Sequence, residues 1–443
     1  MKRLLFILFL STFSSYLFAK HPKKNQYELY FQKILQHEYI QTPEHKFKIK
    51  ELAAYRKNIW KSWEQANLQD EGPGFPLLDS LRAKVIGRWE LPKELEPNAT
   101  LPFIWGYKGK QPSTGYPLFI YIHGSGPKEY EWDTSYQLAQ IFDDAPCIYF
   151  IPQIPNEGPW YRWWQKSKQF AWERLFRKAM LLSNINPNRL YIFGISEGGY
   201  GSQRLASFYA DYFAAAGPMA GGEPLKNAPT ENLSNTAFSL LTGEKDLGFY
   251  RNILTQYTQQ SLDSLQALHP KKYEHRVDLI PDRGHHIDYR PMTPWLSQHT
   301  RNPHPKHFIW EDFDMDGLHR NGFYNLSIQQ RPSDSLRTRY DVDIENNVIH
   351  IQVQNISYKT VEIDSIYGIE MKFNREYTPA KQGKFTLFLD EHLIDLERPV
   401  QVIVNHKEVY NQPVTLDVKN LLKSTVAFYD SERMYPAAIE INL

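Results

Sequence analysis

The sequence predicts an α/β fold, a mostly parallel β-sheet flanked by helices, followed by a C-terminal β-sandwich. Two patterns indicate this. In the middle of the chain, unbroken apolar runs alternate with helical stretches, which is typical of parallel strands buried on both faces. Beyond about residue 304, the runs alternate between apolar and polar residues, as in the half-buried strands of a sandwich. The chain has 443 residues, enough for two or three domains.

Composition narrows the class of protein. Hydrophobic residues make up 42% and charged residues 23%, which is ordinary for a globular protein. The net charge is +1 and no basic run occurs, so we expect no nucleic-acid partner. Cys147 is the one cysteine, which excludes a disulfide framework and a cysteine-rich metal site. No metal site and no cofactor are expected.

The amino terminus predicts export. Lys2 and Arg3 precede an apolar stretch over 4–10, and small and aromatic residues continue it to Ala19, a plausible cleavage point. This pattern is typical of a secretory signal peptide over 1–19, with an uncleaved anchor as the alternative. We expect a secreted or periplasmic protein that does not associate with the membrane once the signal is removed.

Three further regions follow the signal. Residues 20–99 are expected to form an N-terminal helical and β extension, since apolar residues recur at helical spacing over 49–63 and short strand candidates follow at 85–89 and 103–107. Residues 100–303 carry the parallel-sheet pattern and 304–443 the sandwich pattern. The predicted buried strands of the middle region are 118–122, 147–151, 190–193, 237–241 and 277–280.

A candidate nucleophile follows the third of these strands. The segment Gly194-Ile195-Ser196-Glu197-Gly198 lies between the strand and a helical stretch. This arrangement of strand, G-x-S-x-G and helix is the nucleophile elbow, in which glycines on either side of a strained serine avoid clashes in a tight turn. The serine is thereby placed at a helix N-terminus, which favours negative charge.

A second glycine-rich segment follows the first strand. His123-Gly124-Ser125-Gly126 is an HG-type loop of the kind that supplies a backbone N–H to an oxyanion hole. We expect the Gly124 or Ser125 backbone to provide one donor and the Glu197 backbone, directly after the nucleophile, to provide the other.

The acid and the base are expected in the order Ser, Asp, His along the chain. Asp246 follows the strand over 237–241, with Glu244 as its rival. His285 and His286 follow the strand over 277–280. The Gly-His step favours His285 as the base, and His286 remains the alternative. In this scheme the base takes the serine proton and the aspartate holds the imidazole in its tautomer.

On these residues, the region from about 100 to 300 resembles the α/β-hydrolase superfamily. Within it, the region is most similar to secreted esterases of the polyhydroxybutyrate-depolymerase/feruloyl-esterase (esterase D-like) kind and to prolyl-oligopeptidase-like hydrolases. The resemblance implies ester hydrolysis through a Ser-Asp-His triad without a cofactor. The doubled histidine departs from it and leaves the base ambiguous. Residues 393–405 also resemble a β-domain appended to such hydrolases in some bacteria.

The sequence gives only a broad indication of the substrate. Trp160, Trp163 and Trp164 follow the second strand, where loops face the nucleophile, so they are candidates to stack on a sugar or phenolic ring, with plain packing as the alternative. We expect a small-molecule or polysaccharide ester, and polyesters also fit. Two rival functions are a prolyl-oligopeptidase-like serine peptidase and a catalytically silent glycan-binding protein. The oligomeric state stays open.

Overall fold

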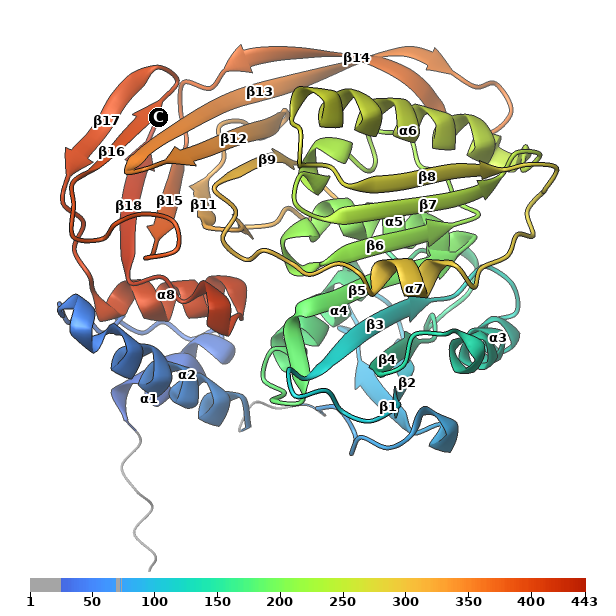
Figure 1. Ribbon diagram of the computed structural model, residues 1–443, viewed down its shortest axis with the longest axis horizontal. Helices are drawn as coiled ribbons and strands as arrows, with labels where there is room; N and C mark the ends of the chain where they lie inside the picture. The colour runs from blue at the N-terminus through green and yellow to red at the C-terminus, as the bar shows by residue number, and fades with distance from the viewer. Residues whose placement is uncertain (1–24, 69–71, 73) are drawn as a thin grey trace, which may run out of the picture.

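The computed structural model describes residues 25–68, 72 and 74–443, so the signal peptide expected at 1–19 lies outside the described residues. In these ranges, no helix combines the length and apolar character needed to cross a bilayer. Figure 1 shows the parallel sheet with its helices on the right and most of the C-terminal strands on the left, while the long hairpin over 348–379 extends across the top toward the parallel sheet.

The middle of the chain forms an eight-stranded sheet in the order β1-β2-β4-β3-β5-β6-β7-β8. From β4 to β8 neighbouring strands are parallel, while β1 and β2 form an antiparallel edge. The predicted fold class is therefore confirmed. The strands are β1 (Ile86–Glu90), β2 (Thr100–Lys108), β3 (Tyr116–Ile122), β4 (Cys147–Pro152), β5 (Ile185–Ile195), β6 (Ala215–Met219), β7 (Ala237–Gly243) and β8 (His275–Ile280).

Helices cover both faces of this sheet, so every residue of β3 and β4 is buried. On one face the core includes residues of α3 and α7, and on the other it includes residues of α4, α5 and α6. These helices are α3 (Lys128–Ile141), α4 (Lys166–Ala179), α5 (Glu197–Phe208), α6 (Arg251–Leu268) and α7 (Met292–Leu296).

The C-terminal part is a sandwich of two sheets. The larger has the order β17-β16-β13-β12-β9, with β14 paired to β13, and the smaller has the order β10-β11-β15-β18. Trp310 and Phe323 stack across them with ring centroids 5.2 Å apart. The strands are β9 (His307–Asp312), β10 (Gly322–Phe323), β11 (Leu326–Gln330), β12 (Arg337–Glu345), β13 (Val348–Ile363), β14 (Glu370–Pro379), β15 (Lys384–Leu389), β16 (Val400–Val404), β17 (Lys407–Gln412) and β18 (Ala437–Asn442).

The N-terminal segment does not form one unit. Its helices α1 (Gln26–Leu35) and α2 (Leu52–Leu68) lie beside α8 (Val418–Phe428) of the C-terminal part, as Figure 1 shows, and Trp63 stacks on Tyr429. In contrast, β1 pairs with β2 and belongs to the eight-stranded sheet. The sheet thus begins before the boundary expected at residue 100, because strand pairing is a long-range contact that local sequence does not reveal.

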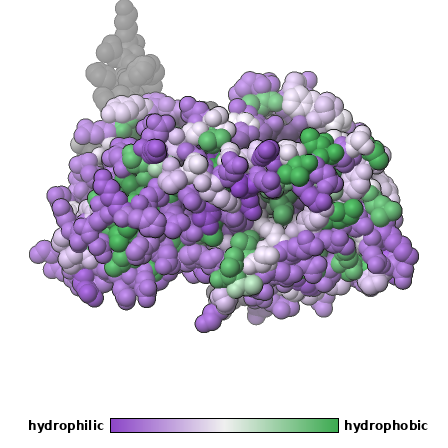
Figure 2. Space-filling view, turned by 90° about the horizontal axis from the view of Figure 1, so that it is seen from above, coloured by the Kyte–Doolittle hydropathy of each residue, from purple (hydrophilic) through white to green (hydrophobic). Residues whose placement is uncertain are grey.

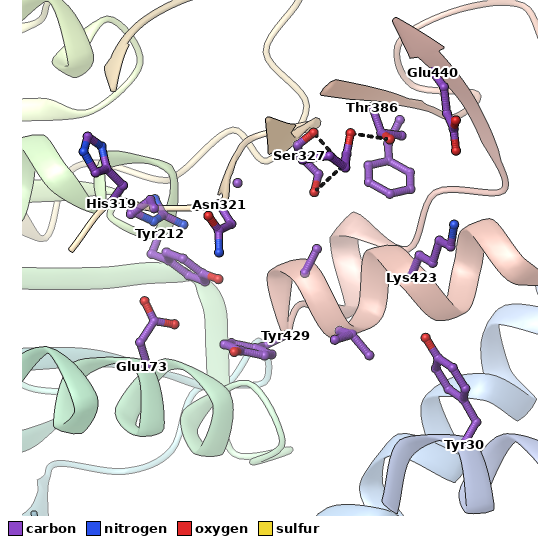
Figure 3. A pocket seen from close by; sticks show the side chains of 16 residues that line it. Tyr30, Glu173, Tyr212, His319, Asn321, Ser327, Thr386, Lys423, Tyr429 and Glu440 are labelled. Carbon is purple, nitrogen blue, oxygen red and sulfur yellow. Dashed lines mark hydrogen bonds between the residues drawn. The ribbon is translucent and has the colours of Figure 1, made fainter. Parts of the chain in front are cut away.

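Buried ion pairs join the parallel-sheet part and the C-terminal part. Asp211, which precedes β6, accepts hydrogen bonds from Arg320 and Arg433, and Arg433 also contacts Asp430 at 2.9 Å. Burial opposes ionisation of Asp211, but the two guanidinium groups hold the pKa of its carboxyl below the ordinary value. A cavity of about 600 Å³ lies at this junction. In Figure 3, Glu173 rises from α4 toward Tyr212, and Lys423 lies on α8. None of the candidate catalytic residues lines this cavity.

Candidate active site

Ser196 occupies a sharp turn between β5 and α5. Its backbone has φ 58° and ψ −115°, a strained conformation for a residue with a side chain. The flanking glycines make this turn possible. A Cβ atom on Gly198 would lie 2.0 Å from the Ile122 carbonyl oxygen, and one on Gly194 would lie 2.4 Å from the Gly198 carbonyl oxygen. The turn is therefore the nucleophile elbow in its geometry as well as in its sequence.

An imidazole and a carboxylate are aligned with this serine. His285 Nε2 lies 3.0 Å from Ser196 Oγ, and His285 Nδ1 lies 2.7 Å from Asp246 Oδ2. Asp246 Oδ1 accepts a further hydrogen bond of 2.6 Å from Arg251. Burial raises the pKa of Asp246, but the bond from His285 and the charge of Arg251 outweigh it, so the net shift is downward. Asp246 therefore stays ionised and can orient the imidazole.

Two loops at the carboxyl ends of β7 and β8 bring Asp246 and His285 together. A Cβ atom on Gly243 would lie 2.0 Å from the Gly284 carbonyl oxygen, so the loops pack backbone against backbone. His286 points elsewhere and is exposed. Glu244, the rival acid, is also exposed and accepts a hydrogen bond from a backbone N–H within the β8 loop.

The HG-type loop lies beside the nucleophile. A Cβ atom on Gly124 would lie 3.4 Å from Ser196 Cβ, and Ser125 lines the same cavity as Ser196. The Gly124 carbonyl oxygen accepts a 2.7 Å hydrogen bond from Tyr161, which holds the loop in place. The predicted oxyanion donors, the backbones of Gly124 or Ser125 and of Glu197, thus lie around Ser196.

His123 has a structural role in this loop. Its side chain is fully buried, and its Nε2 accepts a 3.0 Å hydrogen bond from the Ile154 N–H. Burial lowers the pKa of His123 to about 4, so the imidazole is neutral. The histidine therefore links the ends of β3 and β4.

Of the three tryptophans expected to contact substrate, one lines the cavity. Trp164 lies in the wall, with the Arg204 guanidinium 3.8 Å from its ring centroid. Trp163 is fully buried and donates a 2.9 Å hydrogen bond to the His123 carbonyl oxygen, so its predicted role in substrate binding is wrong. The side chain of Trp163 lies in the core, whereas that of the next residue, Trp164, faces the cavity. Trp160 lies outside the cavity wall, near Lys168.

The cavity beside Ser196 has a volume of about 530 Å³, and its wall combines charged with apolar and aromatic side chains. Its charged lining comes from Arg162, Glu197, Arg204, Glu223, Arg251 and Glu370. Arg204 donates two hydrogen bonds to Glu223, at 2.7 and 3.0 Å. The sequence analysis did not identify the arginines as site residues, because no local motif links them to the serine.

The C-terminal domain supplies one wall of this cavity. Gly368, Ile369 and Glu370, at the end of the long β13–β14 hairpin, line it. Tyr367 packs on Phe249 of the loop that carries Asp246, with ring centroids 4.5 Å apart. Figure 2 shows hydrophobic residues interrupting the hydrophilic surface on the side where the hairpin lies. The exposed apolar residues near the hairpin tip are Leu247, Phe249, Val361, Ile363, Ile366 and Tyr367.

The cavity is not a site of clustered metal ligands. Within the described residues, the one group with suitable ligand spacing is His304, Asp390 and His392, at the start of the C-terminal part and after β15. It shares no residue with the lining of the catalytic cavity.

No protein-family model matches the chain, and no curated protein matches it. Solved structures similar to part of it include a thermostable esterase, 21% identical with a TM-score of 0.38, which covers 50% of this chain and 64% of that protein. A fluorophosphonate-binding serine hydrolase (FphF) of Staphylococcus aureus is 13% identical, with a TM-score of 0.36, and covers 48% of this chain and 97% of that protein. A ferulic acid esterase of Anaeromyces mucronatus is 14% identical, with a TM-score of 0.35, and covers 48% of this chain and 89% of that protein.

These likenesses are low and extend over about half of the chain, so the assignment of the fold rests on the strand order and on the turn at Ser196. The mostly parallel sheet with an antiparallel edge, the elbow after β5, and the loops after β7 and β8 are the features that the sequence resemblance predicted. The chain has the α/β-hydrolase fold, to which a two-sheet C-terminal domain is added.

Proposed function

We propose that the protein is a secreted or periplasmic serine carboxylesterase that acts through an acyl-enzyme. The hydrogen-bonded series Ser196, His285 and Asp246 is the observation that carries this proposal. A serine hydroxyl is a weak nucleophile, and an imidazole 3.0 Å from Oγ that is itself oriented by a buried carboxylate is the arrangement that activates it. The predicted signal peptide supports export.

The reaction follows from the positions of the side chains. His285 Nε2 accepts the Ser196 proton as Oγ forms a bond to the ester carbonyl carbon. The backbone N–H groups of Glu197 and of Gly124 or Ser125 stabilise the negative oxygen of the tetrahedral intermediate. The C–O bond to the alcohol then breaks, and His285 donates its proton to the leaving oxygen. Water attacks the acyl-enzyme by the same route, releasing the acid and restoring the serine.

Asp246 orients the imidazole and remains ionised throughout the reaction. Its bond to Nδ1 places the basic nitrogen toward Oγ and stabilises the imidazolium that forms during the reaction. Arg251 holds the other carboxylate oxygen and so limits rotation of the aspartate. The substrates that we propose are small-molecule, polysaccharide or polyester esters.

Labelling with a fluorophosphonate probe tests the nucleophile. We expect the wild-type protein to be labelled and the Ser196→Ala variant to remain folded but unlabelled. Absence of label on the wild-type protein would favour a silent binding protein and refute the proposal. Hydrolysis of 4-nitrophenyl acetate compared with an aminoacyl 4-nitroanilide separates esterase from peptidase, and we expect the ester to be the substrate that turns over.

A further inference from the structure

We propose that the ester cleaved at Ser196 carries a carboxylate, or a similar oxyanion, close to its reacting carbonyl, and that Arg162 binds this anion. The inference rests on the proposed function and specifies its substrate class. It follows from the charges around the cavity and from which of them already have partners.

Two of the three arginines in the cavity wall are engaged by buried carboxylates. Arg204 forms a two-point contact with Glu223, and Arg251 donates to Asp246 at 2.6 Å. Such two-point or buried charged contacts are strong and specific. These two guanidinium groups therefore shape the site and hold the catalytic acid, and their charges are already balanced.

Arg162 is different. Its NH1 donates to the Tyr161 carbonyl oxygen at 2.7 Å, and its side chain remains 48% exposed at the cavity. Within the described part of the chain, Glu197 is the one carboxyl group in ion-pair range of Arg162, at 3.4 Å. This separation is long for a charge-assisted hydrogen bond, which is normally about 2.7–2.9 Å.

Glu197 is also a poor counter-ion. Its side chain is more than nine-tenths buried, and burial raises its pKa to about 8 despite the opposing influence of Arg162. At neutral pH the carboxyl group is therefore protonated, so the positive charge of Arg162 is left without a negative partner.

The other charged residues around the cavity do not neutralise the positive charge of Arg162. Glu370 on the hairpin pairs with Lys226 at 2.8 Å, so it adds no net negative charge to the wall. With Glu197 neutral, the ion pairs around the cavity cancel, and one positive charge remains, that of Arg162. A cavity with an excess of one sign attracts a ligand group of the opposite sign.

A second observation also favours an oxyanion. Glu197 Oε1 is buried in the wall of the cavity and has no hydrogen-bond partner among the described residues. A protonated carboxyl group can donate its O–H to a ligand oxygen, and an unpaired buried polar atom is costly. A ligand carboxylate can accept from Arg162 and from this acid together. A ligand ammonium group would be repelled by the uncompensated charge of Arg162.

Matched pairs of esters test the inference. On the acyl side, mono-4-nitrophenyl succinate replaces the terminal methyl group of 4-nitrophenyl butyrate with a carboxylate. On the alcohol side, 4-acetoxybenzoate adds a carboxylate to phenyl acetate. We expect the wild-type protein to favour the charged ester in one of these pairs. Arg162→Gln should lower the charged-to-neutral ratio of kcat/KM by about tenfold to a hundredfold, the usual value of a hydrogen bond to a charged group. Arg162→Lys should retain part of the preference.

Arg82→Gln is the matched control, since Arg82 is exposed and does not line the cavity. It should leave the ratio as in the wild type. If the wild type favours the neutral ester in both pairs, or if Arg162→Gln leaves the ratio unaltered, the inference is overturned and the proposed function stands. If the wild type hydrolyses none of the four esters, the proposed function itself fails, and the inference falls with it.

Discussion

Replacement of His285 with alanine removes the group that links the nucleophile to the acid. The variant loses the 3.0 Å contact with Ser196 Oγ and the 2.7 Å contact with Asp246. A general base contributes about 10²–10⁴ to a rate, and here the base and its oriented tautomer are lost together, so we expect the upper end, about 10⁴-fold in kcat/KM. At about 1.4 kcal/mol for each factor of ten, this is about 5 kcal/mol of transition-state stabilisation.

The same substitution should change the folded state little. Asp246 keeps its 2.6 Å hydrogen bond to Arg251, so the buried carboxylate does not become unpaired. We expect the free energy of unfolding to fall by about 2 kcal/mol, since two hydrogen bonds are lost at about 1 kcal/mol each. Initial rates with 4-nitrophenyl acetate and urea unfolding of the same preparations measure the two effects separately.

The neighbouring histidine provides the control. His286 has the same chemistry one residue further on, but it is exposed and lies outside the series of hydrogen bonds. His286→Ala should therefore stay within a few fold of the wild-type rate. The reverse ranking of the two variants would show that the base is His286 and would refute the reasoning from side-chain geometry.

Three further predictions concern stability and activity. Lys168 and Glu96 form a fully buried ion pair, 2.5 Å apart. Lys168→Met should therefore lower the free energy of unfolding by about 3–5 kcal/mol in urea titrations. The same change at the exposed Lys93 should leave the free energy of unfolding as it is. Gly198→Ala places a Cβ atom 2.0 Å from a carbonyl oxygen and should abolish esterase activity, while Gly74→Ala, with nothing within 4 Å, should retain it. Because burial raises the pKa of Glu197 from 4.5 to about 8, the wild type should lose stability relative to Glu197→Gln as pH rises through that interval, by about 5 kcal/mol in total.

Each of these has a clear contrary result. Equal unfolding midpoints for the Lys168→Met and Lys93→Met variants would mean that the buried pair contributes no net stability. Wild-type turnover by Gly198→Ala would mean that the elbow tolerates a side chain. A pH-independent difference between the wild type and Glu197→Gln would mean that Glu197 ionises in the folded protein as it does in the unfolded chain.

The C-terminal part contributes residues to the wall of the cavity beside Ser196. The hairpin of β13 and β14 reaches from the sandwich to the loop after β7, where Tyr367 meets Phe249 and Ile369 lines the cavity. Its tip therefore forms part of the wall beside Ser196.

The elbow, the strands and their order along the chain were predictable because they depend on local physics. A buried parallel strand needs a continuous apolar run, and a strained turn at Ser196 needs glycines two residues away on either side. These requirements appear in a few consecutive residues. The fold class and the placement of candidate residues at strand ends could therefore be read directly from the amino-acid sequence.

The tertiary structure alone decided which side chains meet. The sequence favoured His285 but left His286 as an alternative, and the structure places His285 against Ser196 and His286 in solvent. Trp163 and Trp164 differ in the same way, with one in the core and the other in the cavity wall. The hairpin wall, Arg162 beside Glu197 and the packing of α2 on the C-terminal part join segments far apart in the chain. Such contacts depend on the packing of whole elements, and no short stretch of sequence encodes them.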